Sequence, residues 1–446
     1  MLLAAARGLV SHALPILIAQ LSSIGMMVVD TAVLGHVSVE DLAAVAIGGG
    51  IHISIVFALV GILQALAPVV AHLHGAKRRG EVANVLQQGF WLALALSVPG
   101  CILLSYPAWM LAPVDMDPVV AEKVTAYLGL LAWGMPAALV YRAFYFACNA
   151  VGRPRVLMLI GIAALVIHAL LAWGLALEGW WQAPMGVVGC AWSNVLIAWL
   201  ACFVGAAYLA FGPLGRTYAL FSHLYRPEWL RQRELLKLGL PMGLSNLVEI
   251  TSFTLIALFI APLGATVVAG HRIVANLSAL TYMLPLALGI ATMSAAGQAL
   301  GARDFARLRA TIFAGLAIAA ALSTLSGLVL WWARVPVTGG YTTDTAVHGI
   351  AITLVVYVAI YQFFDALQTI AGHALRAYRI TFVPMLIQTF CFWGIGLGGG
   401  FWLCFHAAHP MGVAGFWLSA VLSLIVAAAL LLSLLWRTMQ AFESTS

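Results

Sequence analysis

Apolar stretches long enough to cross a membrane follow one another along almost the whole chain, separated by short polar segments. Of the 446 residues, 63% are hydrophobic and only 8% are Asp, Glu, Lys or Arg, and the mean hydropathy is +1.04. A membrane helix needs about 20 apolar residues, so this length suits about a dozen spans. Backbone groups inside a bilayer must bond within the chain, which favours helices. The sequence therefore predicts an all-α membrane protein without a soluble domain.

Hydropathy and loop residues together predict twelve transmembrane helices. They cover residues 13–36, 43–73, 84–107, 119–148, 155–178, 186–212, 235–262, 267–299, 309–333, 346–374, 380–405 and 410–438. The N-terminal segment has the charge and the apolar run of a signal peptide, but the run continues to about Gly35 without a convincing cleavage site. We therefore expect this segment to be the first membrane helix.

Basic residues gather in alternate loops, and this pattern predicts the orientation of the chain. Of the 21 Lys and Arg residues, 17 lie on one side of the predicted spans, and the opposite loops hold little beyond Lys123 and Arg334. Basic loops face the cytoplasm. We therefore expect a multi-pass protein of the bacterial inner (plasma) membrane with both termini in the cytoplasm. The net charge of +6 comes from these loops and does not indicate a nucleic-acid partner.

The second half of the chain repeats the first at an offset of 226 residues. The matching pairs are Leu14-Pro15 with Leu240-Pro241, HGAK (74–77) with LGAR (300–303), and PMGVVG (184–189) with PMGVAG (410–415). We therefore predict two six-helix halves, residues 1–212 and 235–446, joined by a basic cytoplasmic linker at 213–234. Because six is even, both halves enter the membrane from the same side, and a pseudo-two-fold axis along the membrane normal relates them.

Three acidic residues, Asp30, Glu249 and Asp365, interrupt the predicted spans. A carboxylate at the bilayer centre costs about 2.5–3.5 kcal/mol on insertion scales, so it is rare without a partner or a function. An acid needed for packing would be expected in both halves, but none of the three recurs at the corresponding position of the other half. We interpret these acids as sites that couple ions or bind cations.

Other chemistry finds little support in the sequence. The six cysteines occur singly, in or beside apolar spans and without ligand-type spacing. The chain contains no HExxH or GxSxG motif. We therefore expect neither an enzyme nor a bound cofactor. Glu40 and Asp41 are interpreted as ordinary loop charges.

Four segments together indicate a family. They are VVDTAVLGHVSVEDLAAVAIG (28–48), ALAPVVAHLHGAKRRGEV (65–82), LGLPMGLSNLVEITSF (238–253) and YQFFDALQTIAGHALR (361–376). In order, spacing and twelve-helix frame, the chain resembles the MATE (multidrug and toxic compound extrusion) transporters, in particular their NorM-like branch. The resemblance covers nearly the whole chain. It implies a secondary exporter that expels lipophilic organic cations by alternating access, in exchange for inward Na⁺ or H⁺.

The resemblance also implies a coupling-cation site in the second half. NorM-like transporters combine acids of the seventh and tenth helices with aromatic residues. Carried onto this chain, these residues are Glu249, Asp365, Tyr361 and Tyr282. Two carboxylates with hydroxyl neighbours suit a hard cation such as Na⁺, although two close carboxylates can instead share a proton. The resemblance to the Na⁺-coupled branch favours Na⁺.

In the first half the chain departs from the family pattern. The fifth helix of the family commonly carries two Asn residues four apart that bond the first-helix acid, and here these positions are His168 and Ala172. An imidazole can donate a hydrogen bond as Asn does, and it can also take up a proton. We predict that His168 pairs with Asp30 and adds a pH dependence to cargo release. Asp344, in the loop before the tenth span, is either a contact for departing cations or a solvated charge.

The alternative function is that of a flippase for lipid-linked precursors. Such a cavity binds a pyrophosphate and needs buried Lys or Arg, but the chain offers only Arg142 and Arg272, near span ends. The deep acids instead favour small lipophilic cationic drugs or dyes as cargo. Beyond the cargo we expect contacts with membrane lipid, a monomeric protein and no nucleic acid.

Overall fold

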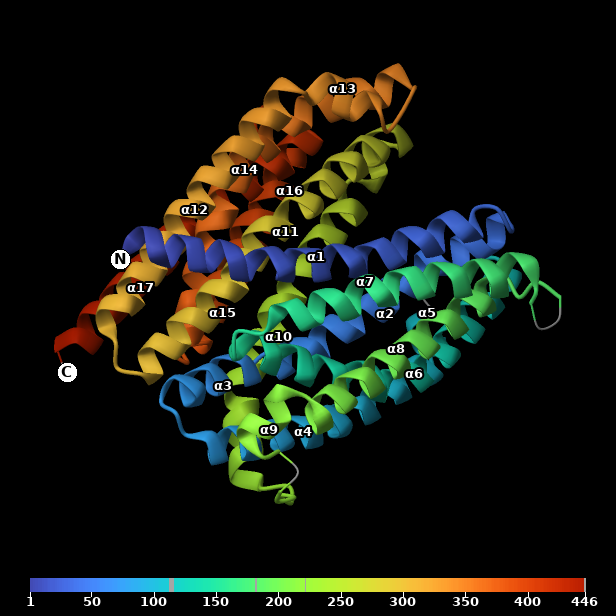
Figure 1. Cartoon of the computed structure of the whole chain (residues 1–446). Helices are drawn as coiled ribbons and strands as arrows, with labels where there is room; N and C mark the ends of the chain where they lie inside the picture. The colour runs from blue at the N-terminus through green and yellow to red at the C-terminus, as the bar shows by residue number, and fades with distance from the viewer. Residues whose placement is uncertain (112–115, 181–182, 221, 445–446) are drawn as a thin grey trace. The chain divides into compact units, whose positions relative to one another are not determined.

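The computed structural model describes residues 1–111, 116–180, 183–220 and 222–444, and in these ranges the chain forms helices and turns without a strand. Twelve of the described helical segments are long and apolar enough to cross a membrane (Figure 1). The prediction of an all-α membrane protein with twelve spans is therefore confirmed. The first helix starts at Leu2 instead of residue 13, because helix formation continues beyond the apolar stretch that hydropathy detects.

Contacts divide the chain into two compact units. The N-unit is Pro15–Gly243, and the C-unit is Leu244–Ser446 together with Met1–Leu14. The N-unit contains most of α1 (Leu2–Leu34), then α2 (Val39–Leu63), α3 (Leu66–Gly75), α4 (Arg79–Ser105), α5 (Ala108–Leu111), α6 (Pro118–Ala150), α7 (Pro154–Trp173), the π-helix η1 (Gly174–Glu178), α8 (Val187–Phe211), α9 (Pro213–Tyr218) and the start of α10 (Trp229–Phe259).

The C-unit contains the rest of α10 and all later helices. They are the 3₁₀ turn η2 (Ala261–Leu263), α11 (Ala265–Gly301), α12 (Phe305–Trp332), α13 (Arg334–Gly339), α14 (Thr345–Ala377), α15 (Phe382–Thr389), the π-helix η3 (Phe390–Gly399), α16 (Gly400–Phe405) and α17 (Val413–Ser444).

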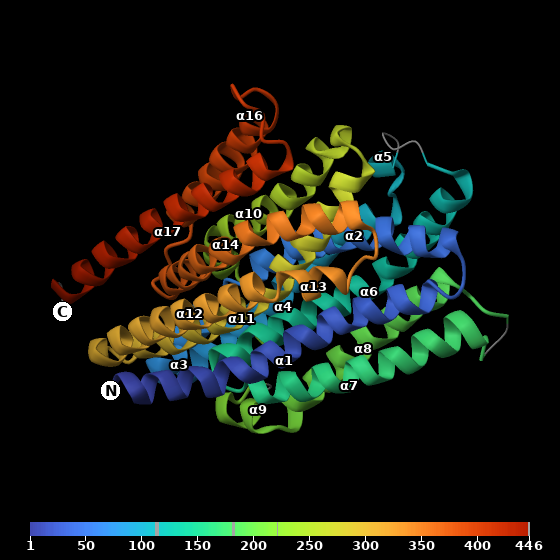
Figure 2. The same ribbon diagram turned by 90° about the horizontal axis from the view of Figure 1, so that it is seen from above.

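One long helix lies at the centre of each unit. In the N-unit α6 packs against α2, α4 and α8, and in the C-unit α14 packs against α11, α12 and α17. Figure 2 shows α11, α12 and α14 side by side. Small residues permit this close packing. At Gly327 of α12, an added Cβ would lie 2.5 Å from the carbonyl oxygen of Ala359 in α14. Since α6 and α14 each form the fourth span of their half, the core follows the sequence repeat.

The repeated PMGV motif forms the same turn in both units. Gly186 and Gly412 have positive φ angles of 54° and 58°, which favour glycine. Gly189 and Gly415, three residues later, pack so closely on the backbone of the preceding span that an added Cβ would lie within 3.0 Å of it. The motif therefore recurs because two turns have the same backbone requirement.

The contact boundaries differ from the predicted division into 1–212, a linker at 213–234 and 235–446. The chain passes from one unit to the other inside α1, between Leu14 and Pro15, and inside α10, between Gly243 and Leu244. Segment 213–234 contains α9 and the first turns of α10, and it belongs to the N-unit. Its polar composition indicates a linker, but side chains of α4 bind its backbone and hold it in place.

Candidate functional site

The C-unit contains both second-half acids and both predicted tyrosines. Glu249 lies on α10, Tyr282 on α11, and Tyr361 and Asp365 on α14. Asp365 and Tyr361 expose only 5% and 7% of their surfaces. The Tyr282 hydroxyl pairs with the Glu249 carboxyl, and the two acids are close enough to interact electrostatically. Because neighbouring carboxylates repel one another, a cation or a shared proton stabilises the pair.

A chain of amides orients Asp365. Gln368 Nε2 donates to Asp365 Oδ1 at 3.0 Å, and Gln388 Nε2 of α15 donates to Gln368 Oε1 at 3.2 Å. All three side chains are buried. The sequence analysis missed both glutamines, although each is a polar residue inside an apolar span, which was the available signal.

Aromatic rings enclose Tyr361. Its ring centroid lies 6.4 Å from that of Phe253 on α10 and 6.1 Å from that of Trp417 on α17, both in edge-on geometry. These contacts fix the position of the tyrosine beside Asp365. Aromatic faces near a carboxylate pair are suited to a lipophilic cation, which interacts with the ring quadrupole.

One basic residue also acts on this site. Arg376, in the last turn of α14, interacts electrostatically with Glu249 and Tyr282. The sequence analysis did not single out Arg376. With two carboxylates and one guanidinium, the ionised site carries one excess negative charge, which one monovalent cation neutralises.

A small cavity lies beside Asp365, between α11, α12 and α14, and Thr281, Ser323 and Gln362 contribute to its lining. Ser326 Oγ donates to Gln362 Oε1 at 2.7 Å. The buried Nε2 of Gln362 has no partner among the described residues. An unsatisfied buried amide costs free energy, so a water molecule is the natural occupant of this cavity.

The ligand set of the C-unit suits a hard monovalent cation. Within the described ranges, no three His, Cys, Asp or Glu side chains gather as a metal-binding group. The site instead offers carboxylate, hydroxyl and amide oxygens, which are typical ligands of Na⁺-like ions and poor ligands of soft transition metals.

The N-unit holds the first-half acid in a separate polar network. His168 Nε2 lies 3.0 Å from Asp30 Oδ1, and Asn194 Nδ2 donates to Asp30 Oδ2 at 2.9 Å. Asp30 exposes 5% of its surface and His168 none. The predicted contact between His168 and Asp30 is therefore present. The sequence analysis missed Asn194, which supplies from α8 the amide that Ala172 of α7 lacks.

Glycines bring α1 and α7 together. An added Cβ at Gly161 of α7 would lie 3.4 Å from the Cα of Ala19, and one at Gly25 of α1 would lie 3.1 Å from the Leu165 side chain. A Cβ at Gly161 would touch the α1 backbone, and one at Gly25 would press on the Leu165 side chain. This close approach places Asp30 within hydrogen-bond distance of the imidazole.

Ser193 of α8 lets the network accommodate two protonation states without heavy-atom movement. Its Oγ lies 2.9 Å from His168 Nδ1 and 3.2 Å from the carbonyl oxygen of His168. When the imidazole is neutral with its proton on Nε2, the Ser193 hydroxyl donates to Nδ1. When both ring nitrogens carry protons, Nδ1 donates to Oγ, and the hydroxyl turns to the carbonyl oxygen.

The hydrogen bonds of the Asp344 side chain belong to neither network. It is the N-cap of α14, and its Oδ1 accepts hydrogen bonds from the backbone N–H groups of Ala346 and Val347 at 2.8 and 3.0 Å. Capping explains an acid at this position. A contact between Asp344 and departing cations stays a prediction.

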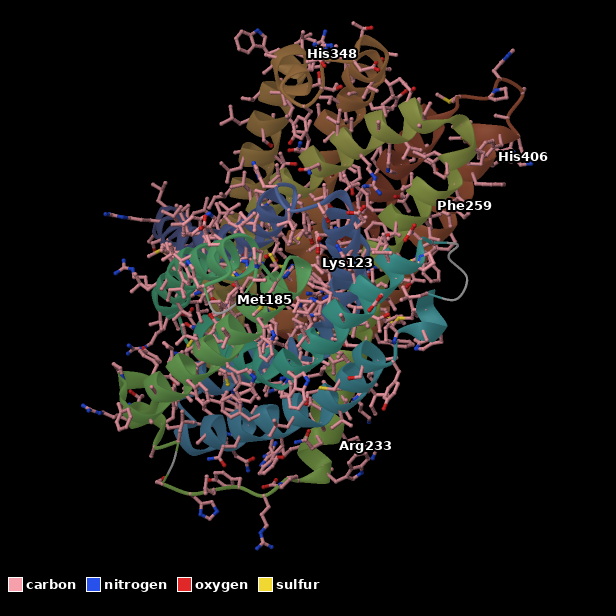
Figure 3. All side chains as sticks on the ribbon, turned by 90° about the vertical axis from the view of Figure 1, so that its right-hand side faces the viewer. Lys123, Met185, Arg233, Phe259, His348 and His406 are labelled. Carbon is pink, nitrogen blue, oxygen red and sulfur yellow. The ribbon has the colours of Figure 1, made fainter. Side chains whose placement is uncertain are left out.

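Asp41 is not an ordinary loop charge, and that interpretation is wrong. The side chain is buried with 5% exposure, and it accepts hydrogen bonds from Lys123 Nζ at 2.6 Å and from the Val187 backbone N–H at 2.9 Å. It also accepts one from Ser38, the N-cap of α2. Asp41 therefore links the starts of α2, α6 and α8, near Lys123 and Met185, which are labelled in Figure 3.

Comparison with known proteins places these sites in context. The MatE family model matches residues 15–173 and 241–402. A probable multidrug resistance protein NorM of Aromatoleum aromaticum is 49% identical, with 94% of this chain and 91% of that protein covered. Multidrug resistance protein MdtK of Proteus mirabilis is 32% identical, with 97% and 95% covered. Among solved structures, the eukaryotic MATE transporter AtDTX14 shares the fold, with a TM-score of 0.89, 19% identity and 98% coverage of both chains.

Proposed function

This chain belongs to the MatE family, and on that premise we propose that it is a secondary multidrug exporter that expels lipophilic organic cations in exchange for Na⁺ or H⁺. It is a transporter and not an enzyme. The observation that carries the proposal is the pair formed by the partly buried Glu249 and the buried Asp365, with Tyr282 and Tyr361 beside them. A lipid-linked precursor flippase is not favoured, because the relatives carry multidrug resistance names and the site of the C-unit combines two carboxylates with one guanidinium.

For the coupling ion we propose a single Na⁺ bound by Glu249 and Asp365 with the hydroxyl of Tyr282. The excess charge of the site, after Arg376 is counted, is matched by one monovalent cation. Cargo and Na⁺ would then compete for the same negative charge. Since each would favour a different conformation, Na⁺ entry would drive cargo release.

We further propose that the protein is a monomer of the bacterial inner membrane with both termini in the cytoplasm. The basic residues of the N-unit support this orientation. Their loops adjoin the start of α4 and the segment 213–234, at the end opposite Lys123. Basic loops stay in the cytoplasm during insertion.

Transport into proteoliposomes tests the proposed function. We expect an imposed Na⁺ gradient to drive the accumulation of ethidium against its concentration gradient. A pH gradient alone should give a lower rate of ethidium uptake. The reason is the oxygen-rich acid pair, which binds a monovalent cation. Protein-free vesicles provide the control. Transport of anionic detergents but not of ethidium would exclude a cationic cargo, and equal driving by both gradients would exclude Na⁺ as the main coupling ion.

His168 gives a second, chain-specific prediction. We expect His168→Asn to keep ethidium export but to flatten its pH dependence in an assay that spans about pH 6 to 8. Asn can donate to Asp30 but cannot take up a proton. The other titratable groups near the pair, Tyr127 and Cys190, stay in place. The measurement is the initial rate across this range, and an unchanged profile would reduce His168 to a packing role.

A further inference from the structure

Segment 222–234, which we name the linker platform, is fixed to α4 by its backbone. Gln87 Nε2 donates to the carbonyl oxygen of His223 at 2.8 Å, and Gln87 Oε1 accepts from the N–H of Tyr225 at 2.7 Å. Gln88 repeats this arrangement, donating to the carbonyl of Arg226 at 2.8 Å and accepting from the N–H of Glu228 at 2.9 Å. The platform therefore presents its side chains at fixed positions on the N-unit.

A pocket of about 330 Å³ opens between the platform and the start of α4. Its lining consists of Arg78, Arg79, Gly80, Glu81, Asn84 and Tyr225. Arg78 and Arg231 both pair with Glu81, so the negative charge there is already compensated. Arg79 is exposed and has no ion-pair partner among the residues that the structure describes. Arg231 also pairs with Glu234, and Glu228 lies nearby. The first residues of α4, the loop before them and the platform still hold six cations against three carboxylates: Lys77, Arg78, Arg79, Arg226, Arg231 and Arg233 against Glu81, Glu228 and Glu234. The pocket therefore lies on a surface of net positive charge, which fits an anion.

Asn84 sets a second requirement for a ligand of this pocket. Its Nδ2 donates to Glu228 Oε1 at 3.1 Å, and a carboxylate can only accept, so the amide cannot turn around. Its Oδ1 is buried and has no partner within the described ranges. A ligand that satisfies the pocket therefore combines an anionic group for Arg79 with a hydroxyl donor for Asn84. A glycerophosphate has both.

Large apolar side chains stand beside these charges. Leu224, Trp229 and Leu230 expose 75%, 72% and 76% of their surfaces. The basic residues Arg226 and Arg233 alternate with them along the platform. Tryptophan and arginine together are typical of the membrane interface, where the ring enters the headgroup layer and the cation meets anionic lipid. In Figure 3, Arg233 lies well below Lys123.

We propose that this pocket binds the glycerophosphate headgroup of an anionic phospholipid of the cytoplasmic leaflet, with Trp229 and Leu230 inserted beside its acyl chains. Arg78 and Arg79 meet the phosphate, and Asn84 accepts from the glycerol hydroxyl. The site lies within the N-unit and does not depend on the coupling chemistry of the C-unit.

The sequence repeat supplies a matched control. At the offset of 226, Arg78 and Arg79 correspond to Asp304 and Phe305, so the equivalent loop of the C-unit lacks this pair of cations. Arg307, in the first turn of α12, is exposed as Arg79 is. Arg307→Gln therefore removes an equivalent surface charge without touching the pocket.

The test is a titration of the full-length protein, purified in a neutral detergent, with dioctanoyl phosphatidylglycerol and dioctanoyl phosphatidylcholine. We expect only the anionic lipid to raise the thermal unfolding midpoint. Arg79→Gln should weaken its apparent affinity about tenfold, as loss of one charge-assisted hydrogen bond predicts. Arg307→Gln should leave it unchanged. Native mass spectrometry counts retained lipid on the folded fraction, so the comparison holds even if a variant is less stable.

Three results would overturn the proposal. They are equal stabilisation by phosphatidylcholine, undiminished lipid retention in Arg79→Gln, and full stabilisation by soluble glycerol 1-phosphate. The last result would identify a site for a soluble anion. A further variant tests the proposed contact between Trp229 and the acyl chains. Trp229→Ser should reduce retention of the lipid but not of glycerol 1-phosphate.

Discussion

Glu249→Gln and Asp365→Asn should each reduce Na⁺-driven ethidium export to the rate of protein-free vesicles while the protein still folds. Each change removes a negative charge at nearly constant volume. The remaining acid is then balanced by Arg376, so the site no longer has excess charge for Na⁺ or a cationic cargo. Without differential binding of the ion to two conformations, the gradient cannot do work on the cargo. Uptake in proteoliposomes with matched protein content measures this effect.

Asp304→Asn is the matched control for these variants. Asp304 is also an acid of the C-unit, but it is exposed and caps α12, and Asn caps helices equally well. We expect wild-type export from this variant. Gradient-driven export at the wild-type rate by both Glu249→Gln and Asp365→Asn would place the coupling site elsewhere in the chain.

The second large effect concerns stability. Asp41→Ala should lower the free energy of unfolding by about 2–4 kcal/mol, because a half-buried ammonium and a buried backbone N–H lose their partner together. The loss should be smaller than for a fully buried pair, because Lys123 exposes 30% of its side chain and solvent weakens the ion pair. Unfolding in increasing SDS, followed by circular dichroism, measures the change.

Asp344→Ala provides the comparison for Asp41→Ala, because the side chain of Asp344 caps a helix and forms no ion pair within the described ranges. Loss of such a cap costs about 1 kcal/mol. If the two variants lost the same stability, Asp41 would act as a cap alone, and its bonds to Lys123 and Val187 would contribute nothing measurable.

Properties that are local in sequence could be predicted without the structure. The twelve spans follow from hydropathy over about 20 residues, because desolvation of each span depends on its own composition. The repeat is visible because the PMGV turn needs glycine twice in each half. The acids Asp30, Glu249 and Asp365 stood out because a charge inside an apolar span needs a reason wherever it is.

Only the tertiary structure decided which groups bind these acids. Asp30 meets His168 across 138 residues and Asn194 across 164, and no local pattern selects Asn194 over other polar residues. Gln388, Arg376 and the ion pair between buried Asp41 and half-buried Lys123 were missed for the same reason. Hydropathy is additive along the chain, whereas a hydrogen bond depends on distance and angle between side chains that only folding brings together.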